Sequence, residues 1–210
     1  PKTARPKRSH NWDRIYSDNL SQEVYEELLE KVFNNMDKFL EPGCSFYIWN
    51  GHYQFAPMHK ILTELKYHIG CVIVWAKPNF AISYGDYHQQ TEFCLYGWKE
   101  GAKHRWFGGV NESSLWEVKR DPTRQYVHPT QKPCALSERA TKNSSQRGEI
   151  VLDLFLGSGS TLIAAETLDR RGFGIELDPR YCDVIVRRYI NFAGKDKVSP
   201  EIVSRYCKEV

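Results

Sequence analysis

Apolar residues recur every four positions between residues 21 and 40 of the chain. Val24, Leu28, Val32 and Met36 form this series, and Leu29, Phe33 and Leu40 widen it. A period close to 3.6 residues is typical of an amphipathic helix with one buried face. The sequence therefore predicts a helix from Ser21 to Leu40, which Pro42-Gly43 ends.

Two apolar runs in the first half of the chain predict strands on either side of a second helix. Ser45–Trp49 is short, aromatic and β-branched, whereas Cys71–Trp75 is almost continuously apolar, as expected of a parallel strand covered on both faces. The helix between them opens at Pro57, and we expect Gly70 to end it. Its apolar face holds Met58, Ile61, Leu62 and Leu65. Another strand is predicted from Thr91 to Trp98.

The pattern after His128 alternates between helix and strand. It predicts helices within 133–145, over 160–168, up to Phe192 and from Ser199, and strands over 150–154 and 172–177. This order is typical of an α/β fold. Two strands cannot make a whole sheet, so we expect the strands of the first half to complete it. The segment 97–127 has glycines and tryptophans without a helical period, and we interpret it as an insertion.

Composition excludes several classes of protein. The chain has 210 residues, 41% hydrophobic and 26% charged, which is enough to build one domain with a core. Its apolar runs are too short to cross a membrane. The six cysteines form no C-x-x-C pair, so we expect reduced thiols and no metal site. A net charge of +3 does not by itself identify a nucleic-acid-binding protein.

The most informative stretch is a glycine turn between a strand and a helix. An apolar strand runs into Gly157-Ser158-Gly159, and a second strand is predicted to end at Glu176. Glycine lets the backbone approach a ligand, and a carboxylate on the neighbouring strand can accept hydrogen bonds from both hydroxyls of a ribose. The pattern favours a ligand that contains a nucleoside, although a purely structural turn has the same glycines.

Details of the turn discriminate among nucleoside cofactors. Leu162 stands where a dinucleotide-binding turn has its third glycine, and Gly159-Ser160-Thr161 lacks the lysine of a P-loop. Asp153, just before the turn, would repel a phosphate but could accept a hydrogen bond from an ammonium group. These features suit S-adenosylmethionine, which has an amino acid end and no phosphate.

Three motifs resemble those of DNA methyltransferases that methylate an exocyclic amine. They are D-L-F-L-G-S-G-S-T over 153–161, G-I-E-L-D-P-R-Y over 174–181 and H-P-T-Q-K-P over 128–133. Their order is that of the permuted beta class. The resemblance implies a Rossmann-like α/β fold with a mostly parallel sheet flanked by helices. It divides the chain into a catalytic half (1–96), an inserted target-recognition region (97–127) and a cofactor-binding half (128–210).

The resemblance also implies which residues contact S-adenosylmethionine. Glu176 would bind the ribose, and Thr130 with Lys132 would lie near the methionine end; Lys132 could instead be a solvated lysine. The expected cofactor-binding residues are Asp153, Phe155, Gly157, Ser158, Gly159, Ser160, Thr161, Glu176, Thr130 and Lys132. The family's catalytic signature, a polar or acidic residue followed by Pro-Pro and an aromatic residue, does not occur in the sequence. We expect it upstream of Pro1 and expect this chain alone not to transfer methyl groups.

A base must leave the duplex before its amine can react, and extruded bases stack on aromatic side chains. Phe80 and Tyr84 are the candidates for such a base pocket, whereas we expect Trp75 to be packed in the core. The inserted segment interleaves basic residues with tryptophans, and we expect Lys103, Arg105, Lys119 and Arg120 to contact DNA phosphates. A solvated loop held in place by tryptophans is the alternative.

The sequence thus predicts a DNA methyltransferase that acts on N6 of adenine in double-stranded DNA, within a restriction-modification system. Two alternatives stay open: methylation of N4 of cytosine, and a noncatalytic module that binds a nucleoside or DNA. We expect a cytoplasmic protein of a prokaryotic or phage-infected cell, without a membrane partner, that could form a homodimer.

Overall fold

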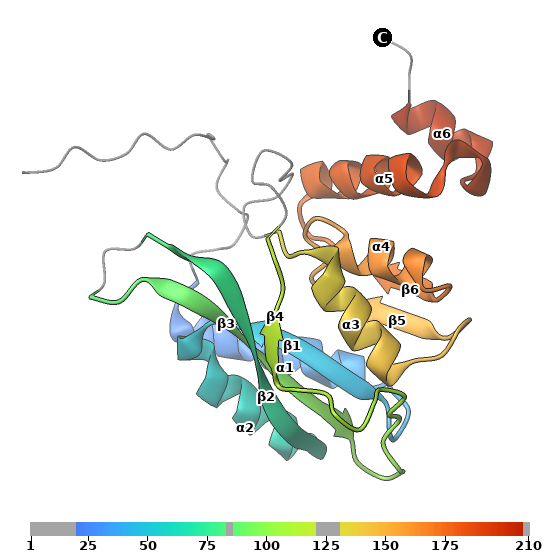
Figure 1. The fold of residues 1–210 in the computed structure, drawn as a ribbon. Helices are drawn as coiled ribbons and strands as arrows, with labels where there is room; N and C mark the ends of the chain where they lie inside the picture. Colours follow the sequence, from blue (N-terminus) through green and yellow to red (C-terminus); the bar gives the residue numbers. More distant parts are fainter. Residues whose placement is uncertain (1–19, 83–85, 121–130, 208–210) are drawn as a thin grey trace, which may run out of the picture.

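The computed structural model describes residues 20–82, 86–120 and 131–207 of the chain. Its helices are α1 (Gln22–Asp37), α2 (Phe55–Glu64), α3 (Cys134–Ser144), α4 (Ser160–Thr167), α5 (Pro179–Ala193) and α6 (Pro200–Tyr206). Its strands are β1 (Ser45–Asn50), β2 (Tyr67–Ala81), β3 (Gln89–Lys99), β4 (Leu115–Glu117), β5 (Ile150–Asp153) and β6 (Arg171–Gly174). Helices and strands alternate as the sequence predicts, and the α/β class is confirmed (Figure 1).

The strands of the described residues form two sheets, of which the larger is mixed and the smaller is parallel. The larger sheet has the order β1-β3-β2-β4, in which β3 is antiparallel to β1 and β2, whereas β4 is parallel to β2. β1, β2 and β4 therefore share one direction. β5 and β6 form a separate parallel pair. The expectation of one mostly parallel sheet is corrected in two respects: β3 runs in reverse, and the strands are hydrogen-bonded in two groups.

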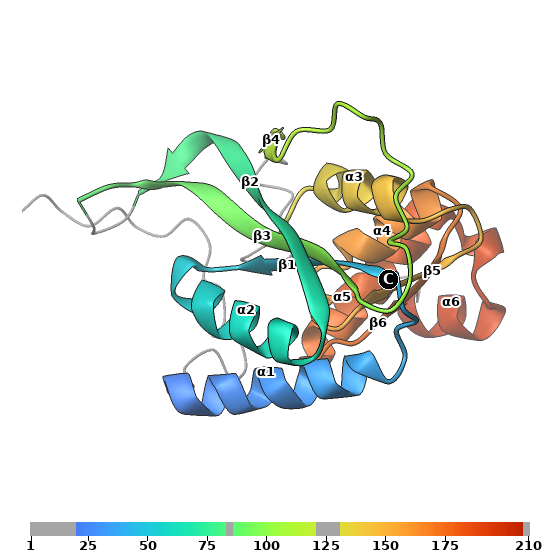
Figure 2. The ribbon, with the colours of Figure 1, turned by 90° about the horizontal axis from the view of Figure 1, so that it is seen from below.

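Helices cover both faces of the larger sheet (Figure 2). On one face, Leu29 and Phe33 of α1 and Leu62 of α2 pack with Leu95 of β3. The opposite face is an aromatic layer that Leu136 of α3 joins; its other buried members are Ile73, Trp75, Cys94, Tyr96 and Trp116. Successive residues of β3 alternate between these layers because side chains of a strand point to opposite faces. The sheet is thus a two-sided core.

The contacts at the two ends of α3 relate the two sheets. Just before α3 begins, the Lys132 carbonyl accepts a 2.8 Å hydrogen bond from the Ser160 hydroxyl, and Ser160 follows β5 in the chain. Near its last turn, Phe107 N–H donates to the Asn143 carbonyl at 2.7 Å, and Arg105 is ion-paired with Glu149, which precedes β5. Arg105 N–H also donates to the carbonyl of Gly43, which precedes β1.

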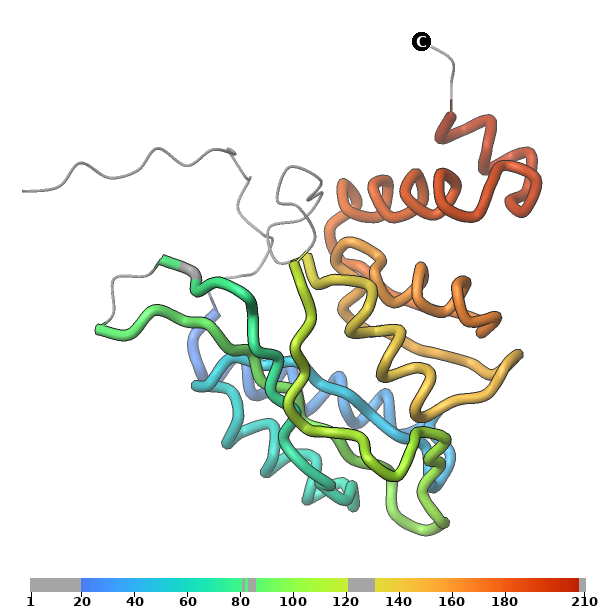
Figure 3. Tube along the Cα trace, in the orientation of Figure 1, coloured from blue at the N-terminus to red at the C-terminus, as the bar shows by residue number. Residues whose placement is uncertain are grey.

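These contacts fix the direction of β5 relative to β1. The starts of both strands lie at the Arg105 end, while the Lys132 side chain reaches Glu92, near the end of β1 in the β1–β3 register. The carboxyl ends of β1, β2, β4 and β5 therefore lie on the same side. The trace from β5 to α6 stays together beside the larger sheet (Figure 3). Ligands of α/β sheets bind at such an edge.

Two helix starts follow local sequence signals. Ser21 accepts a hydrogen bond from Val24 N–H at the start of α1, and Asp178 accepts one from Arg180 N–H at the start of α5. Both residue types are favoured N-caps because they satisfy free N–H groups. Among the described residues, no helix is long and apolar enough to cross a membrane.

The role of Gly70 differs from the prediction. α2 ends at Glu64, and Lys66 adopts a positive φ of 63°, so the turn is complete before Gly70 is reached. Gly70 lies inside β2, where an added Cβ would be 3.0 Å from the Trp98 ring. It serves close packing rather than helix termination. The strand expected over 71–75 is the centre of the longer β2, and it is antiparallel to β3.

Two further boundaries differ. β6 ends at Gly174, so Glu176 lies just beyond the strand instead of closing it. The segment 97–127 is not wholly separate from the sheet: its first residues end β3, and β4 within it pairs with β2. Its role in target recognition stays a prediction.

Gly97→Ala is expected to destabilise the fold strongly. An added Cβ would be 2.7 Å from Cζ of the buried Phe46 and would also meet the His68 carbonyl oxygen, and neither neighbour can move without disturbing the sheet. We expect the free energy of unfolding to fall by about 3 kcal/mol. Gly109→Ala is the control, because no atom lies within 4 Å of its added Cβ. Urea denaturation followed by circular dichroism measures both; equal stability of the two variants would contradict this packing.

Candidate cofactor-binding site

The glycine turn joins β5 to α4 through two left-handed residues. Gly157 has φ of 56° and Gly159 has φ of 81°, conformations that glycine adopts without strain. An added Cβ on Gly159 would be 3.1 Å from the Ile185 side chain of α5. The turn is therefore built from glycine for two reasons, backbone conformation and close approach of a neighbouring helix.

Glu176 holds the turn from a position just beyond the neighbouring strand, β6. Its Oε2 accepts a hydrogen bond from Gly157 N–H at 2.7 Å, and its Oε1 accepts one from Asp178 N–H at 2.9 Å. The strand pairing continues past β6, since Leu156 N–H donates to the Ile175 carbonyl at 2.9 Å. The carboxylate thus lies directly beside the glycine turn, where the sequence pattern predicts it. Each carboxylate oxygen can accept a further hydrogen bond.

Asp153 closes the same turn from the other side. Its Oδ2 accepts a 2.6 Å hydrogen bond from the Thr161 hydroxyl, and its Oδ1 accepts a 3.0 Å bond from Phe155 N–H. The two predicted residues Asp153 and Thr161 are therefore in direct contact. This places a carboxylate at the turn, which makes the site unfavourable for a phosphate.

Ser158 and Ser160 brace the turn from its buried side. Both are buried, and their hydroxyls lie 3.2 Å apart. Arg188 of α5 donates to the Ser158 carbonyl at 2.8 Å and to its hydroxyl at 3.1 Å. Arg188 was not among the residues predicted for the site. It lies outside the motif in sequence, and its position on α5 gave no chemical signal.

Lys132 lies beside the turn and is not a freely solvated lysine. Its carbonyl accepts the hydrogen bond from Ser160, its Nζ is 3.2 Å from Glu92 Oε2, and it lies 5.8 Å from the centre of the Trp49 ring. Its side chain is 29% exposed. Lys132 therefore joins the glycine turn to the larger sheet.

Glu92 is shared by two lysines. Lys77 Nζ of β2 is 2.6 Å from Glu92 Oε1, and Lys77 is only 8% exposed. Burial by itself would raise the pKa of the Glu92 carboxyl, but the positive charges of Lys132 and Lys77 and their hydrogen bonds outweigh it, so the pKa lies below its ordinary value. The carboxylate is ionised and bound at both oxygens.

The exposed rings near this edge differ in their surroundings. Phe155 lies two residues after β5 and is 61% exposed, whereas Phe80 is half exposed and stacks on His88 with 4.8 Å between the ring centres. Trp75 is buried, and its indole N–H donates to the Val118 carbonyl at 2.8 Å, which confirms its packing role. Thr130 and Tyr84 lie outside the described residues.

The four predicted DNA-binding residues fall into two separate groups. Lys119 and Arg120 follow β4 and line a hollow with Pro78 and Asn79 of β2, next to Lys77. Lys103 and Arg105 lie where β3 ends and β1 begins, and Arg105 is ion-paired with Glu149. The two groups lie toward opposite ends of β3. Between Glu92, which contacts Lys77, and Lys99, which ends the strand, β3 spans about 23 Å at the usual rise per residue. The structure brings only Lys119 and Arg120 to the edge that carries the glycine turn.

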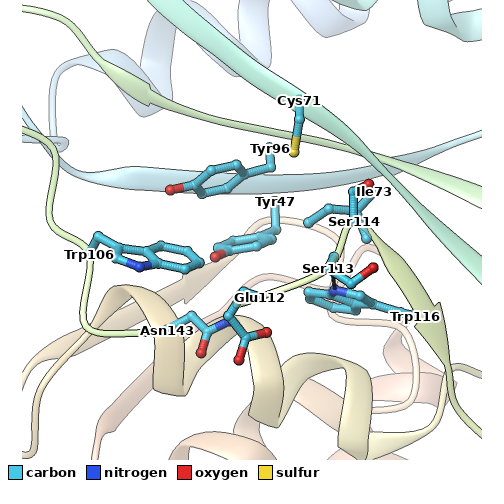
Figure 4. Close-up of a pocket in the computed structure, with 10 residues that line it drawn as sticks. All are labelled: Tyr47, Cys71, Ile73, Tyr96, Trp106, Glu112, Ser113, Ser114, Trp116 and Asn143. Atoms are coloured by element: carbon cyan, nitrogen blue, oxygen red, sulfur yellow. Dashed lines mark hydrogen bonds between the residues drawn. The ribbon is translucent and has the colours of Figure 1, made fainter. Parts of the chain in front are cut away.

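An aromatic cavity of about 210 Å³ lies at the other end of α3 (Figure 4). Tyr47, Tyr96, Trp106 and Trp116 line it, with Glu112 and Asn143 at its rim. The Tyr47 hydroxyl is 2.8 Å from the Ser144 hydroxyl. Since α3 has 11 residues, about 16 Å of helix separate this cavity from Lys132. It is distinct from the glycine turn.

The fold and the turn define an α/β protein in which glycines, carboxylates and a paired lysine gather where the parallel strands end. The chain belongs to the DNA methylase family, whose model matches residues 4–187. This family membership agrees with the resemblance of the three sequence motifs.

Curated relatives are bacterial modification enzymes. The chain is 29% identical over 168 residues to the type II methyltransferase M2.MboI of Moraxella bovis, covering 72% of this chain and 61% of the relative. It is 28% identical over 203 residues to the type II methyltransferase M.HpaI of Haemophilus parainfluenzae, covering 86% and 65%. The chain thus spans less than two thirds of the length of these two relatives.

Solved structures share the fold. The M1.HpyAVI–SAM complex superposes with a TM-score of 0.70 at 27% identity, covering 81% of this chain and 84% of that one. The cytosine-N4-specific PvuII DNA methyltransferase superposes with a TM-score of 0.73 and covers 90% of this chain and 78% of that one. Its identity is 17%, so this likeness concerns the fold alone.

Phe155→Ala is expected to weaken binding of a nucleoside ligand without loss of stability. The ring is mostly exposed, so its removal should change the free energy of unfolding by less than about 0.5 kcal/mol. Loss of aromatic stacking should weaken binding of S-adenosylmethionine by about tenfold. Calorimetric titration measures this. Phe107→Ala, an exposed ring at the other end of α3, is the control; equal affinities of the two variants would contradict a role for Phe155.

Proposed function

We propose that this chain is the cofactor-binding and DNA-binding portion of a DNA methyltransferase that uses S-adenosylmethionine to methylate N6 of adenine. The observation that carries the proposal is the glycine turn held by Glu176, at the shared carboxyl end of the strands. Family membership and the M1.HpyAVI–SAM complex support the choice of cofactor. Methyl transfer itself is proposed for the whole protein, because the chain's sequence contains no Pro-Pro motif.

The residues at the turn suit S-adenosylmethionine. Glu176 has acceptor capacity left for ribose hydroxyls, and Gly157 and Gly159 let a ligand approach the backbone. Asp153 disfavours a phosphate and can accept a hydrogen bond from the ammonium of the amino acid end, while Lys132 can face its carboxylate. When bound, the cofactor supplies a methyl group on a sulfonium, and the protein's residues orient it and exclude competing ligands.

Adenine is proposed as the target because the motifs resemble those of adenine-specific enzymes. The likeness to the cytosine-N4-specific PvuII enzyme is a likeness of fold, which does not favour cytosine for this chain. The type II methyltransferases among the relatives support a role in a restriction-modification system. The partner of the whole protein is then double-stranded DNA.

Titration of the folded chain with S-adenosylmethionine tests the cofactor proposal. We expect saturable binding that Glu176→Ala weakens by roughly tenfold to a hundredfold, since a hydrogen bond to a charged group is lost. Glu201→Ala, an exposed carboxylate on α6, is the control and should bind as the unchanged chain does. NAD should not bind. Absence of S-adenosylmethionine binding by the folded chain, or equal affinity of the two variants, would overturn the proposal.

Lys119→Ala/Arg120→Ala is expected to lower the affinity of the chain for double-stranded DNA. Each lost phosphate contact should also reduce the slope of log K against log salt by about 0.9. Fluorescence anisotropy at several salt concentrations measures both quantities. Lys60→Ala, an exposed lysine on α2, is the control. The same assay on Lys103→Ala and Arg105→Ala tests whether the DNA-contacting surface reaches the other end of the sheet.

An unchanged salt slope for Lys119→Ala/Arg120→Ala would show that the hollow beside β2 does not contact DNA. The Lys119→Ala/Arg120→Ala variant should keep its affinity for S-adenosylmethionine, because neither residue is among those that brace the glycine turn.

A further inference from the structure

Three charged side chains from three different segments meet near the carboxyl end of β2. They are Lys77 of β2, Glu92 of β3 and Lys132, just before α3. Each lysine also lies over a tryptophan: Lys77 Nζ is 5.4 Å from the centre of the Trp75 ring, and Lys132 Nζ is 5.8 Å from that of Trp49. We call these three residues the lysine–glutamate cluster.

The lysine–glutamate cluster carries one positive charge more than its carboxylate can neutralise. Glu92 is closer to Lys77, at 2.6 Å, than to Lys132, at 3.2 Å. Lys77 is also the most buried of the three, at 8% exposure against 29% for Lys132 and 33% for Glu92. A buried ammonium needs a counter-charge more than an exposed one does. Glu92 is therefore principally the partner of Lys77.

Lys132 lies between the glycine turn and the other two residues of the lysine–glutamate cluster. Its carbonyl is bound by Ser160, the first residue of α4, while its side chain extends to the sheet. If Lys77 were absent, Glu92 would neutralise Lys132 alone, because both residues are partly exposed and already in contact. The charge of Lys77 thus determines whether the cluster around Lys132 is positive or neutral.

We propose that Lys77 is a positioning residue that occupies Glu92 and thereby leaves a positive charge on Lys132 to attract the carboxylate at the amino acid end of S-adenosylmethionine. This inference rests on the proposed function, since it assumes that the cofactor binds at the glycine turn.

Charge-changing variants separate this role from a structural one. Lys77→Met keeps a linear apolar side chain over Trp75 and reduces the net charge of the cluster from +1 to 0. Glu92→Gln raises the net charge to +2, and the double variant returns it to +1. A structural ion-pair network would be damaged by either single change, because each leaves a charge without its partner. An electrostatic role instead predicts opposite effects of the two single changes: Lys77→Met weakens binding, whereas Glu92→Gln keeps or strengthens it.

The experiment titrates the folded chain and its variants with S-adenosylmethionine and with 5′-methylthioadenosine, which lacks the amino acid end. We expect Lys77→Met to bind S-adenosylmethionine about tenfold more weakly, because a charge-assisted interaction is lost. Glu92→Gln should bind at least as tightly as the unchanged chain. The double variant, whose cluster again has a net charge of +1, should bind as tightly as the unchanged chain. Affinity for 5′-methylthioadenosine should not change in any variant.

Glu112→Gln is the matched control, since Glu112 is similarly exposed, at 30%, and is ion-paired with Arg139. A double variant as weak as Lys77→Met, or an equal loss of affinity for both ligands, would overturn the inference. If Lys77→Met does not fold, Glu92→Gln decides alone: weaker binding of S-adenosylmethionine would overturn it. Failure of the unchanged chain to bind either nucleoside would instead overturn the proposed function.

Discussion

The arrangement of the candidate site depends on α3, which spans the distance between two sheets that share no strand pairing in the described residues. One end of α3 is tied to the glycine turn by the bond from Ser160 to the Lys132 carbonyl. Its other end is tied to the segment after β3 by the bond from Phe107 to the Asn143 carbonyl. Because a helix of this length is nearly rigid, these two contacts place the carboxyl end of β5 beside that of β1.

This placement explains why the chemistry gathers at one edge. The glycine turn, Glu176 and Asp153 come from the β5–β6 pair, whereas Glu92 and Lys77 come from the larger sheet. Lys132 is the point where both groups meet. A cofactor at the turn would therefore have carboxylates on one side and a lysine on the other, as suits a ligand with an ammonium, a carboxylate and no phosphate.

Local features of the fold could be predicted from the sequence, and nonlocal pairings could not. The period of α1 and the run into Gly157 are local signals, and both elements occur where expected. The reversed direction of β3 has no local signal, since its residues suit either direction. The sequence predicts Gly70 at a helix end, whereas the structure needs glycine there for close packing against the Trp98 ring. That neighbour lies far along the chain, so no local pattern reveals it. The Lys77–Glu92 pair and Arg188 were missed for the same reason.

The central claim is that S-adenosylmethionine binds at the glycine turn beside Lys132. Hydrogen exchange of the chain with and without saturating S-adenosylmethionine tests it most directly, because Gly157 and Asp178 N–H already report on the turn through Glu176. The account predicts slower exchange over residues 153–161 and 174–178 and no change over 103–107. Slower exchange confined to the aromatic cavity around Tyr47 and Trp106, with an unchanged turn, would contradict it.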